Sequence, residues 1–503
     1  MLALLIATPA AADVISKAPE AVTVTVYRDH PMTAAQLREL DDDTAGLAMI
    51  AETRTVDLPA GRTRIEFQGV ADAIIPASAA VTGLPGQLVE RNFNYDLLDP
   101  GSLIERSVGQ SVTLRRTNPK TGRVDEEPAT LRSGPDGVVA QTRGGVEALG
   151  CGAGPQALVF DHLPAGLAAQ PTLSVIADAP TAGRYKLTLS YLTVRIDWSA
   201  DYVARLSADG KTLDLTGWLT LSNRSDASFA AAPTSVVAGE LSRVDPDLPD
   251  IAPKQVESEC WGQRRVPVSI AAYPAAAANV TEITVTAEKR QQSLQDLPVR
   301  TTQSELGDYK LYSLVEPTTL AARQTKQIRF LHQRGVKFDK LYVFRADDWY
   351  GFEDQPIRPA MMVLRFQNKA GDGLGLPLPS GEVSVRQPQA IAGGADLFIG
   401  DRGLRDVPVG EEFELPVSPA SDIQVKARVV SNDDNGQRVT VEFTVTNAKP
   451  QPVAFELRQR PEGDDFKIFS ETRRHVLKNG DDVWRLKLPA NGSVKLGYTF
   501  GSD

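Results

Sequence analysis

Apolar side chains recur at every second position along residues 185–223, and this period of two constrains the fold more than any other feature. The alternation includes Leu187, Leu189, Tyr191, Leu213, Leu215, Leu219 and Leu221. Only a β-strand places positions two apart on one face. Between the two runs, Asp209-Gly210 supplies the positive φ of a tight hairpin turn. We predict antiparallel strands with one buried face, and we assign Trp198 and Trp218 to core packing.

Short alternating runs separated by turn residues continue along most of the chain. The sequence holds 39 glycines and 34 prolines, many of them at turn-like positions, and β-branched alternation is frequent. A chain of 503 residues is also too long for a single core, since a domain takes roughly 100–200 residues. The sequence therefore predicts a mainly β protein built from several β-sandwich or small-barrel modules in series.

Changes in pattern divide the chain into modules. A β-meander is expected over 13–96, and a small β-module over 97–171, with one short helix near Pro100. A central split β-sandwich is expected over 172–420. Within it, residues 244–304 are rich in Pro, Ala and Gln and predict a flexible insertion, beyond which strands from Tyr309 onward complete the sheet begun at Tyr185. Regular short strands over 421–503 predict an immunoglobulin-like or fibronectin-like sandwich.

The first twelve residues, MLALLIATPAAA, form a short apolar run that ends in small residues. This pattern is typical of a signal peptide, although the usual positive n-region is missing, and the alternative is a buried first strand. No later segment has the roughly 18 apolar residues of a spanning helix. We therefore expect an exported, periplasmic protein whose mature chain has no transmembrane segment. In that compartment Cys151 and Cys260 can form a disulfide, and the sequence leaves open whether they do.

The charge balance argues against nucleic acid as a partner. The chain carries 54 Lys and Arg residues against 64 Asp and Glu residues, with a pI near 5.2. Binding to a phosphate backbone requires a basic stripe, and none is present.

Residues suited to catalysis or metal binding are few. The four histidines (His30, His162, His332 and His475) lie far apart in sequence and match no metal motif. The acidic runs 41–43 and 245–250 offer calcium-type oxygens, but such runs are more often solvated. We predict no catalytic residue, no metal and no cofactor.

The best candidate for a binding surface is an aromatic loop with neighbouring carboxylates. Its residues are Asp347, Asp348, Trp349, Tyr350 and Phe352. Aromatic rings beside carboxylates suit sugar stacking or a protein hot spot. The alternative is a hairpin tip whose rings fold onto the sheet.

Several segments, in the same order, resemble the mucoidy-inhibitor-A-like family of bacterial envelope proteins, a family of domains of unknown function. They are residues 189–223, LGDYKLYSLVEPTTLAARQTKQIRFL, MVLRFQNKAGDGLGLPLPSGEVSV and VTNAKPQPVAFELRQR. Many relatives carry a helical coiled coil between the N-terminal and central parts, so this chain resembles a compact form without it. Relatives also tend to carry a His-Thr-Pro element, whereas the matching span 405–411 lacks the histidine. The family supplies no catalytic residues to transfer.

Two functions follow as hypotheses. The first is a non-enzymatic scaffold of the cell envelope that binds an envelope protein or polysaccharide through loops. The second is a hydrolase of envelope polysaccharide that uses Asp347 and Asp348, or Glu353. Adjacent carboxylates on a strand point to opposite faces, which favours the scaffold. The sequence sets no oligomeric state.

Overall fold

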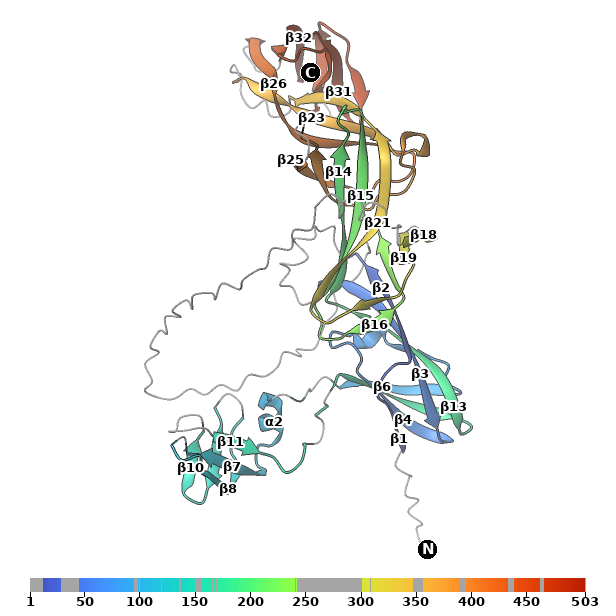
Figure 1. Ribbon diagram of the computed structural model, residues 1–503, viewed down its shortest axis with the longest axis vertical. Coiled ribbons are helices and arrows are strands. Elements are labelled where there is room, and N and C mark those ends of the chain that lie inside the picture. The colour runs from blue at the N-terminus through green and yellow to red at the C-terminus, as the bar shows by residue number, and fades with distance from the viewer. Residues whose placement is uncertain are drawn as a thin grey trace.

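The structure is a computed structural model of an elongated, mainly β protein (Figure 1). It describes residues 12–28, 45–94, 98, 100–118, 120–134, 137–149, 156–164, 167–168, 170–239, 241, 301–307, 309–346, 356–389, 395–432, 438–461 and 466–502. In this part of the chain the only α-helix is α2 (Pro100–Arg106). The predicted fold class, mainly β with several sheets, is confirmed.

Two facing sheets make the N-terminal part. The first has the order β1-β4-β12-β6, from β1 (Ala12–Ser16), β4 (Gly61–Gln68), β12 (Thr172–Ala179) and β6 (Gln87–Asn94). The second has the order β18-β19-β17-β2-β3-β13-β5. Its strands are β18 (Thr301–Leu306), β19 (Tyr309–Leu314), β17 (Thr234–Ala238), β2 (Ala21–Tyr27), β3 (Leu47–Leu58), β13 (Gly183–Thr193) and β5 (Ala80–Thr82). The last four residues of the predicted insertion, 301–304, therefore lie in β18, and residues 244–300 lie outside the described part.

The small module is inserted between β6 and β12, which pair antiparallel with Asn94 opposite Thr172. It contains α2 and a sheet of order β10-β9-β8-β7-β11. Its strands are β7 (Ser111–Thr117), β8 (Val124–Leu131), β9 (Val139–Thr142), β10 (Gly145–Ala148) and β11 (Gln156–Val159). The module has its own core, which includes Ile104 of the helix and Leu114 and Leu131 of the sheet. Figure 1 shows it projecting to one side of the long axis.

The central sheet has the order β21-β15-β14-β24-β25, whereas the strand of Tyr185, β13, shares the seven-stranded sheet with β18 and β19. The strands of the central sheet are β21 (Gln324–Lys337), β15 (Thr212–Asn223), β14 (Ile196–Leu206), β24 (Gly381–Gln387) and β25 (Leu397–Leu404). β14 and β15 pair antiparallel across the predicted turn, where Gly210 has a φ of 66°. Nearby, β16 (Phe229–Ala232) pairs with β20 (Thr318–Leu320).

Two expectations for residues 185–223 need correction. The stretch contributes to two sheets, because β13 ends at Thr193 and the chain turns at Arg195, whose φ is 67°. Trp198 is fully buried as predicted, but Trp218 is only partly buried. Trp218 occupies an even position in β15, opposite in direction to its buried neighbours Leu219 and Leu221.

The C-terminal part is a nine-stranded sheet of order β29-β32-β27-β26-β23-β22-β28-β31-β30. The strands are β22 (Asp339–Arg345), β23 (Arg358–Gln367), β26 (Glu412–Asn432), β27 (Arg438–Asn447), β28 (Val453–Gln459), β29 (Phe466–Glu471), β30 (Val476–Lys478), β31 (Asp481–Leu488) and β32 (Gly492–Ser502). Its core includes Trp484 and Tyr498, whose rings stack at 4.3 Å. Tyr342 and Phe344 also belong to this core, so it draws on strands that precede residue 421.

One strand connects two cores. The N-terminal and central sheets share one continuous hydrophobic core, to which β26 contributes Phe413, Leu415 and Val417. Further along the same strand, Ile423 and Val425 enter the C-terminal core. Because β26 is 21 residues long and unbroken, the two cores are joined by hydrogen-bonded sheet and not by a linker.

Three buried asparagines occupy equivalent corners. Asn223 ends β15, Asn368 follows β23 and Asn447 ends β27, and each is at most 1% exposed. In every case the side-chain amide donates to loop carbonyls and the side-chain oxygen accepts a loop N–H. The donor bonds run from Asn223 to Ala227 and Ala321, from Asn368 to Leu376 and Pro408, and from Asn447 to Gln451 and Pro489. The N–H groups come from Ser225, Gly375 and Lys449. Each asparagine thus fixes the loop after its strand.

The Asn447 corner can be tested with an isosteric change. In Asn447→Asp the oxygen that accepts from Lys449 is kept, but a carboxylate replaces the amide that donates to Gln451 and Pro489. We expect the free energy of unfolding, measured in urea, to fall by about 3 kcal/mol, because buried carbonyls lose their donors and face a charge. The same change at the exposed Asn432 is the control and should have little effect. Equal effects at the two positions would contradict the role of the corner.

Candidate functional site

The residues predicted to bind a partner lie outside the described residues. Asp347, Asp348, Trp349, Tyr350 and Phe352, together with Glu353, belong to the connection between β22 and β23. The two described strands on either side pair antiparallel, with Val343 opposite Met361. Cys151, Cys260, His30 and the acidic runs 41–43 and 245–250 also lie outside the described part.

The three described histidines lie in three separate places. His162 is exposed. His332 is 3.1 Å from the hydroxyl of Thr216 through Nδ1. His475 lies between two carboxylates, with Nδ1 2.8 Å from Glu471 and Nε2 3.4 Å from Asp482. Over the described ranges, no group of three or more His, Cys, Asp or Glu side chains is arranged to hold a metal ion.

A buried ion pair links the two N-terminal sheets. Glu52 and Arg54 take inward positions of β3 and are 2% and 0% exposed. Arg54 donates to Glu52 at 2.8 Å, and across the sandwich it donates to the carbonyls of Ser16 and Gln68, each at 2.9 Å. Tyr191 completes the set by donating to Glu52 at 2.7 Å. Because the charges are paired and bonded across the sandwich, this cluster serves structure and is closed to a ligand.

A second buried arginine lies where the N-terminal and central sheets meet. Arg28 directly follows β2, and its guanidinium lies 4.2 Å from the ring centroid of Trp198 in β14. It pairs with Asp406 at 3.4 Å and donates to the hydroxyl of Ser380. Burial lowers the pKa of Arg28, and the Asp406 carboxylate opposes this effect. Asp406 belongs to the span 405–411, so this span contributes to the junction between the two sheets.

Charged side chains form a network on the C-terminal sheet. Arg365 of β23 lies 2.8 Å from both Glu414 and Glu456, and Arg458 lies 2.8 Å from Glu414. Lys478 of β30 approaches Glu414 at 3.2 Å. Burial alone would raise the pKa of Glu414, but the hydrogen bonds from Arg458 and Arg365 and the charge of Lys478 lower it to about 2. A carboxyl this acidic is a poor general acid, so the network is suited to holding β23, β26 and β28 together.

The low pKa of Glu414 predicts acid sensitivity. The carboxyl titrates near 4.5 when unfolded and near 2 when folded, which corresponds to about 3 kcal/mol of stability. This contribution is complete above pH 4.5 and is lost as the pH falls towards 2. In Glu414→Gln we expect lower stability at pH 7 and a shallower loss of stability between pH 4.5 and 2, measured by urea unfolding at each pH.

The matched control is Glu411→Gln. Glu411 is a partly exposed carboxylate whose pKa is lowered by its hydrogen bond with Arg405, an arginine that is itself exposed. Exposed pairs contribute little, so the pH dependence of stability should stay close to that of the wild type. An unchanged pH dependence in Glu414→Gln would show that the network does not stabilise the sheet.

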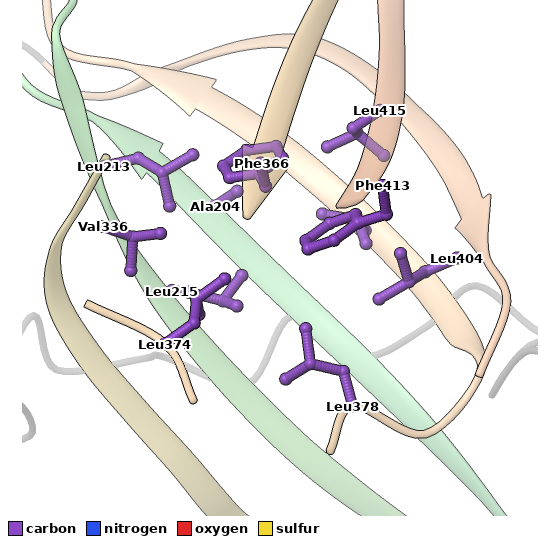
Figure 2. Close-up of a pocket in the computed structure, with 11 residues that line it drawn as sticks. Ala204, Leu213, Leu215, Val336, Phe366, Leu374, Leu378, Leu404, Phe413 and Leu415 are labelled. Atoms are coloured by element: carbon purple, nitrogen blue, oxygen red, sulfur yellow. The ribbon is translucent and has the colours of Figure 1, made fainter. Parts of the chain in front are cut away.

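A small cavity lies in the central core (Figure 2). It is about 20 Å³ in volume and is lined by apolar side chains alone, among them Leu213, Val336, Val383 and Phe413. Figure 2 shows Phe366, Phe413 and Leu404 surrounding it from the side of β23, β25 and β26. A space of this size could hold one water, but water needs polar partners. We therefore interpret it as a dry packing defect and not as a ligand site.

Filling this cavity should stabilise the protein. Val383→Ile adds one carbon atom to a side chain that lines the space, and we expect a gain of about 0.5–1 kcal/mol in the free energy of unfolding. Val385→Ile is the control, because Val385 is equally buried on the same strand but does not line the cavity. Overpacking should destabilise that variant. A loss of stability in Val383→Ile, measured by urea unfolding, would show that the space is already filled.

An open groove with both polar and apolar lining residues lies on the outward face of β27, β29 and β32. It is about 360 Å³ in volume. Hydroxyl groups of Thr440, Ser470 and Thr499 line it, and the ion pair of Glu442 with Lys495, at 3.1 Å, forms another wall. The sequence analysis missed this groove, because threonines at alternate positions of a strand also suit an ordinary solvated face. Unlike the buried cluster of Glu52 and Arg54, the polar side chains of this groove face open space.

Comparison with known proteins identifies no relative: no family model and no curated protein matches the chain. Among the described residues, no helix is long and apolar enough to cross a membrane.

Proposed function

We propose that the protein is an exported, non-enzymatic scaffold of the cell envelope, related to the mucoidy-inhibitor-A-like proteins. One observation carries the proposal: the sheets are joined into a continuous elongated framework. The N-terminal and central sheets share one core, and β26 extends from that core into the C-terminal core. A framework joined in this way keeps its ends apart at a fixed distance, as a scaffold between envelope components requires.

The inserted module supports the same function. It has its own core and is attached to the framework at β6 and β12 alone among the sheets of the described chain. It occupies the place in the chain where the resemblance implies a coiled coil in other members. A domain that projects from a rigid framework is suited to presenting a binding surface to a partner. We propose an envelope protein or a polysaccharide as that partner.

The buried charged groups support a structural role over catalysis. Arg54 with Glu52, and Arg365 and Arg458 with Glu414, are paired within or between sheets. A general acid needs a pKa near the working pH, and the pKa of Glu414 is about 2. These groups therefore stabilise the framework, and the proposed binding chemistry belongs to its surface.

Export can be tested with a reporter that is active only in an oxidising compartment. We expect alkaline phosphatase fused after Asp503 to be active in cells that produce the full chain, and inactive when residues 2–12 are deleted. Equal activity of the two fusions would contradict the predicted signal peptide.

Hydrolysis of envelope glycan can be tested with purified protein. The purified full chain should release no soluble sugar from isolated envelope glycan, and the variant Asp347→Asn, Asp348→Asn, Glu353→Gln should behave like the wild type. Release by the wild type that the variant lacks would establish the hydrolase instead.

A further inference from the structure

The open groove of the C-terminal sheet is formed by a glycine in β32 and by a register shift in β29. Gly497 of β32 leaves a gap in the outward row between Lys495 and Thr499, where a Cβ atom would lie 3.2 Å from the carbonyl oxygen of Val441. In β29 the register shifts between Ile468 and Ser470, which brings Ser470 opposite Thr499. Together the missing side chain and the bulge hollow an otherwise flat face.

Hydroxyl groups form a row along this hollow. The hydroxyls of Thr440 and Thr499 lie 2.9 Å apart, and Ser470 donates to Thr499 at 2.9 Å. Thr472, at the edge, accepts the N–H of Gly497 at 2.9 Å. A hydroxyl has one proton and two lone pairs, so within the described residues this row retains acceptor sites that face the groove.

The groove is close to electrically neutral. Glu442 is paired with Lys495 at 3.1 Å and with Arg428 at 3.4 Å. Glu471 also lines the groove, and its carboxylate accepts hydrogen bonds from Trp484 and from the backbone N–H of His475. A neutral groove lined by hydroxyls and by aliphatic side chains such as Val430 offers no strong attraction to a phosphate, a polyanion or a polycation. It matches a ligand that is itself neutral and rich in hydroxyl groups.

We propose that this groove binds a short, neutral oligosaccharide segment. The volume of about 360 Å³ lies at the lower end of ordinary ligand sites, which suits a few sugar rings and not a large glycan. The hydroxyl row of Thr440, Thr499 and Ser470 recognises sugar hydroxyls, and the Glu442–Lys495 pair offers both an acceptor and a donor. The binding of a sugar is inferred from the groove alone, and only the idea that the sugar comes from the cell envelope rests on the proposed function.

The test uses the full chain and a panel of neutral and acidic sugars. Maltotriose, cellotriose and chitotriose are the neutral probes, and trigalacturonate is the acidic one, each measured by saturation-transfer NMR and calorimetry. The test variant Thr440→Val, Thr499→Val keeps the shape and the strand preference but removes two hydroxyls. We expect at least one neutral probe to bind to the wild type and about tenfold more weakly to the variant.

The control is Thr446→Val, an exposed threonine on the same face of β27 outside the groove. It should bind like the wild type, and far-UV circular dichroism of all variants should be unchanged. No binding of any neutral probe, equal binding by the double variant, or preference for trigalacturonate would overturn the proposal. The phosphatase reporter is independent of these residues, so an active reporter with no sugar binding would remove this inference alone.

Discussion

The loop after a buried strand must satisfy its backbone groups without a sheet partner, and three asparagines meet this constraint. Asn223, Asn368 and Asn447 each donate to loop carbonyls and accept a loop N–H, in a side-chain imitation of backbone pairing. All three lie at or directly after the end of a strand and fix the loop that follows it. These asparagines therefore serve the fold and not a reaction.

Buried arginines hold the sheets together, as the three asparagines hold the loops in place. Arg54 joins β3 to the carbonyls of Ser16 and Gln68 on the facing sheet, and Arg28 joins the end of β2 to Trp198 and Asp406. An arginine has five N–H donors in a planar fork, so one side chain can bond several strands at once. Replacing such a pair with apolar residues often costs little stability. Its specific effect here is to fix which sheets face each other.

The sequence predicted the strands well and their partners in part. Alternation located β13 and β15, and Asp209-Gly210 located the hairpin turn that precedes β15, because period and turn chemistry are local properties. The division of 185–223 between two sheets was missed because the chain turns at Arg195, without Gly or Pro to mark it. The sequence did not predict the inward positions of Glu52 and Arg54 either, since a charged side chain at an alternate position of a strand normally faces solvent. The groove depends on Gly497 and on a register shift in β29, which no periodicity reveals.

Sheet topology also decides where the chain tolerates variation. β6 and β12 are antiparallel neighbours, so the two ends of the small module lie side by side and a module of any size fits between them. β17 and β18 are different, because both pair antiparallel with β19 and therefore run parallel to each other. Two parallel strands cannot be joined by a tight turn, so β17 and β18 cannot follow each other directly along the chain. The topology thus permits modules of different size between β6 and β12, whereas β17 and β18 need a longer separation along the chain.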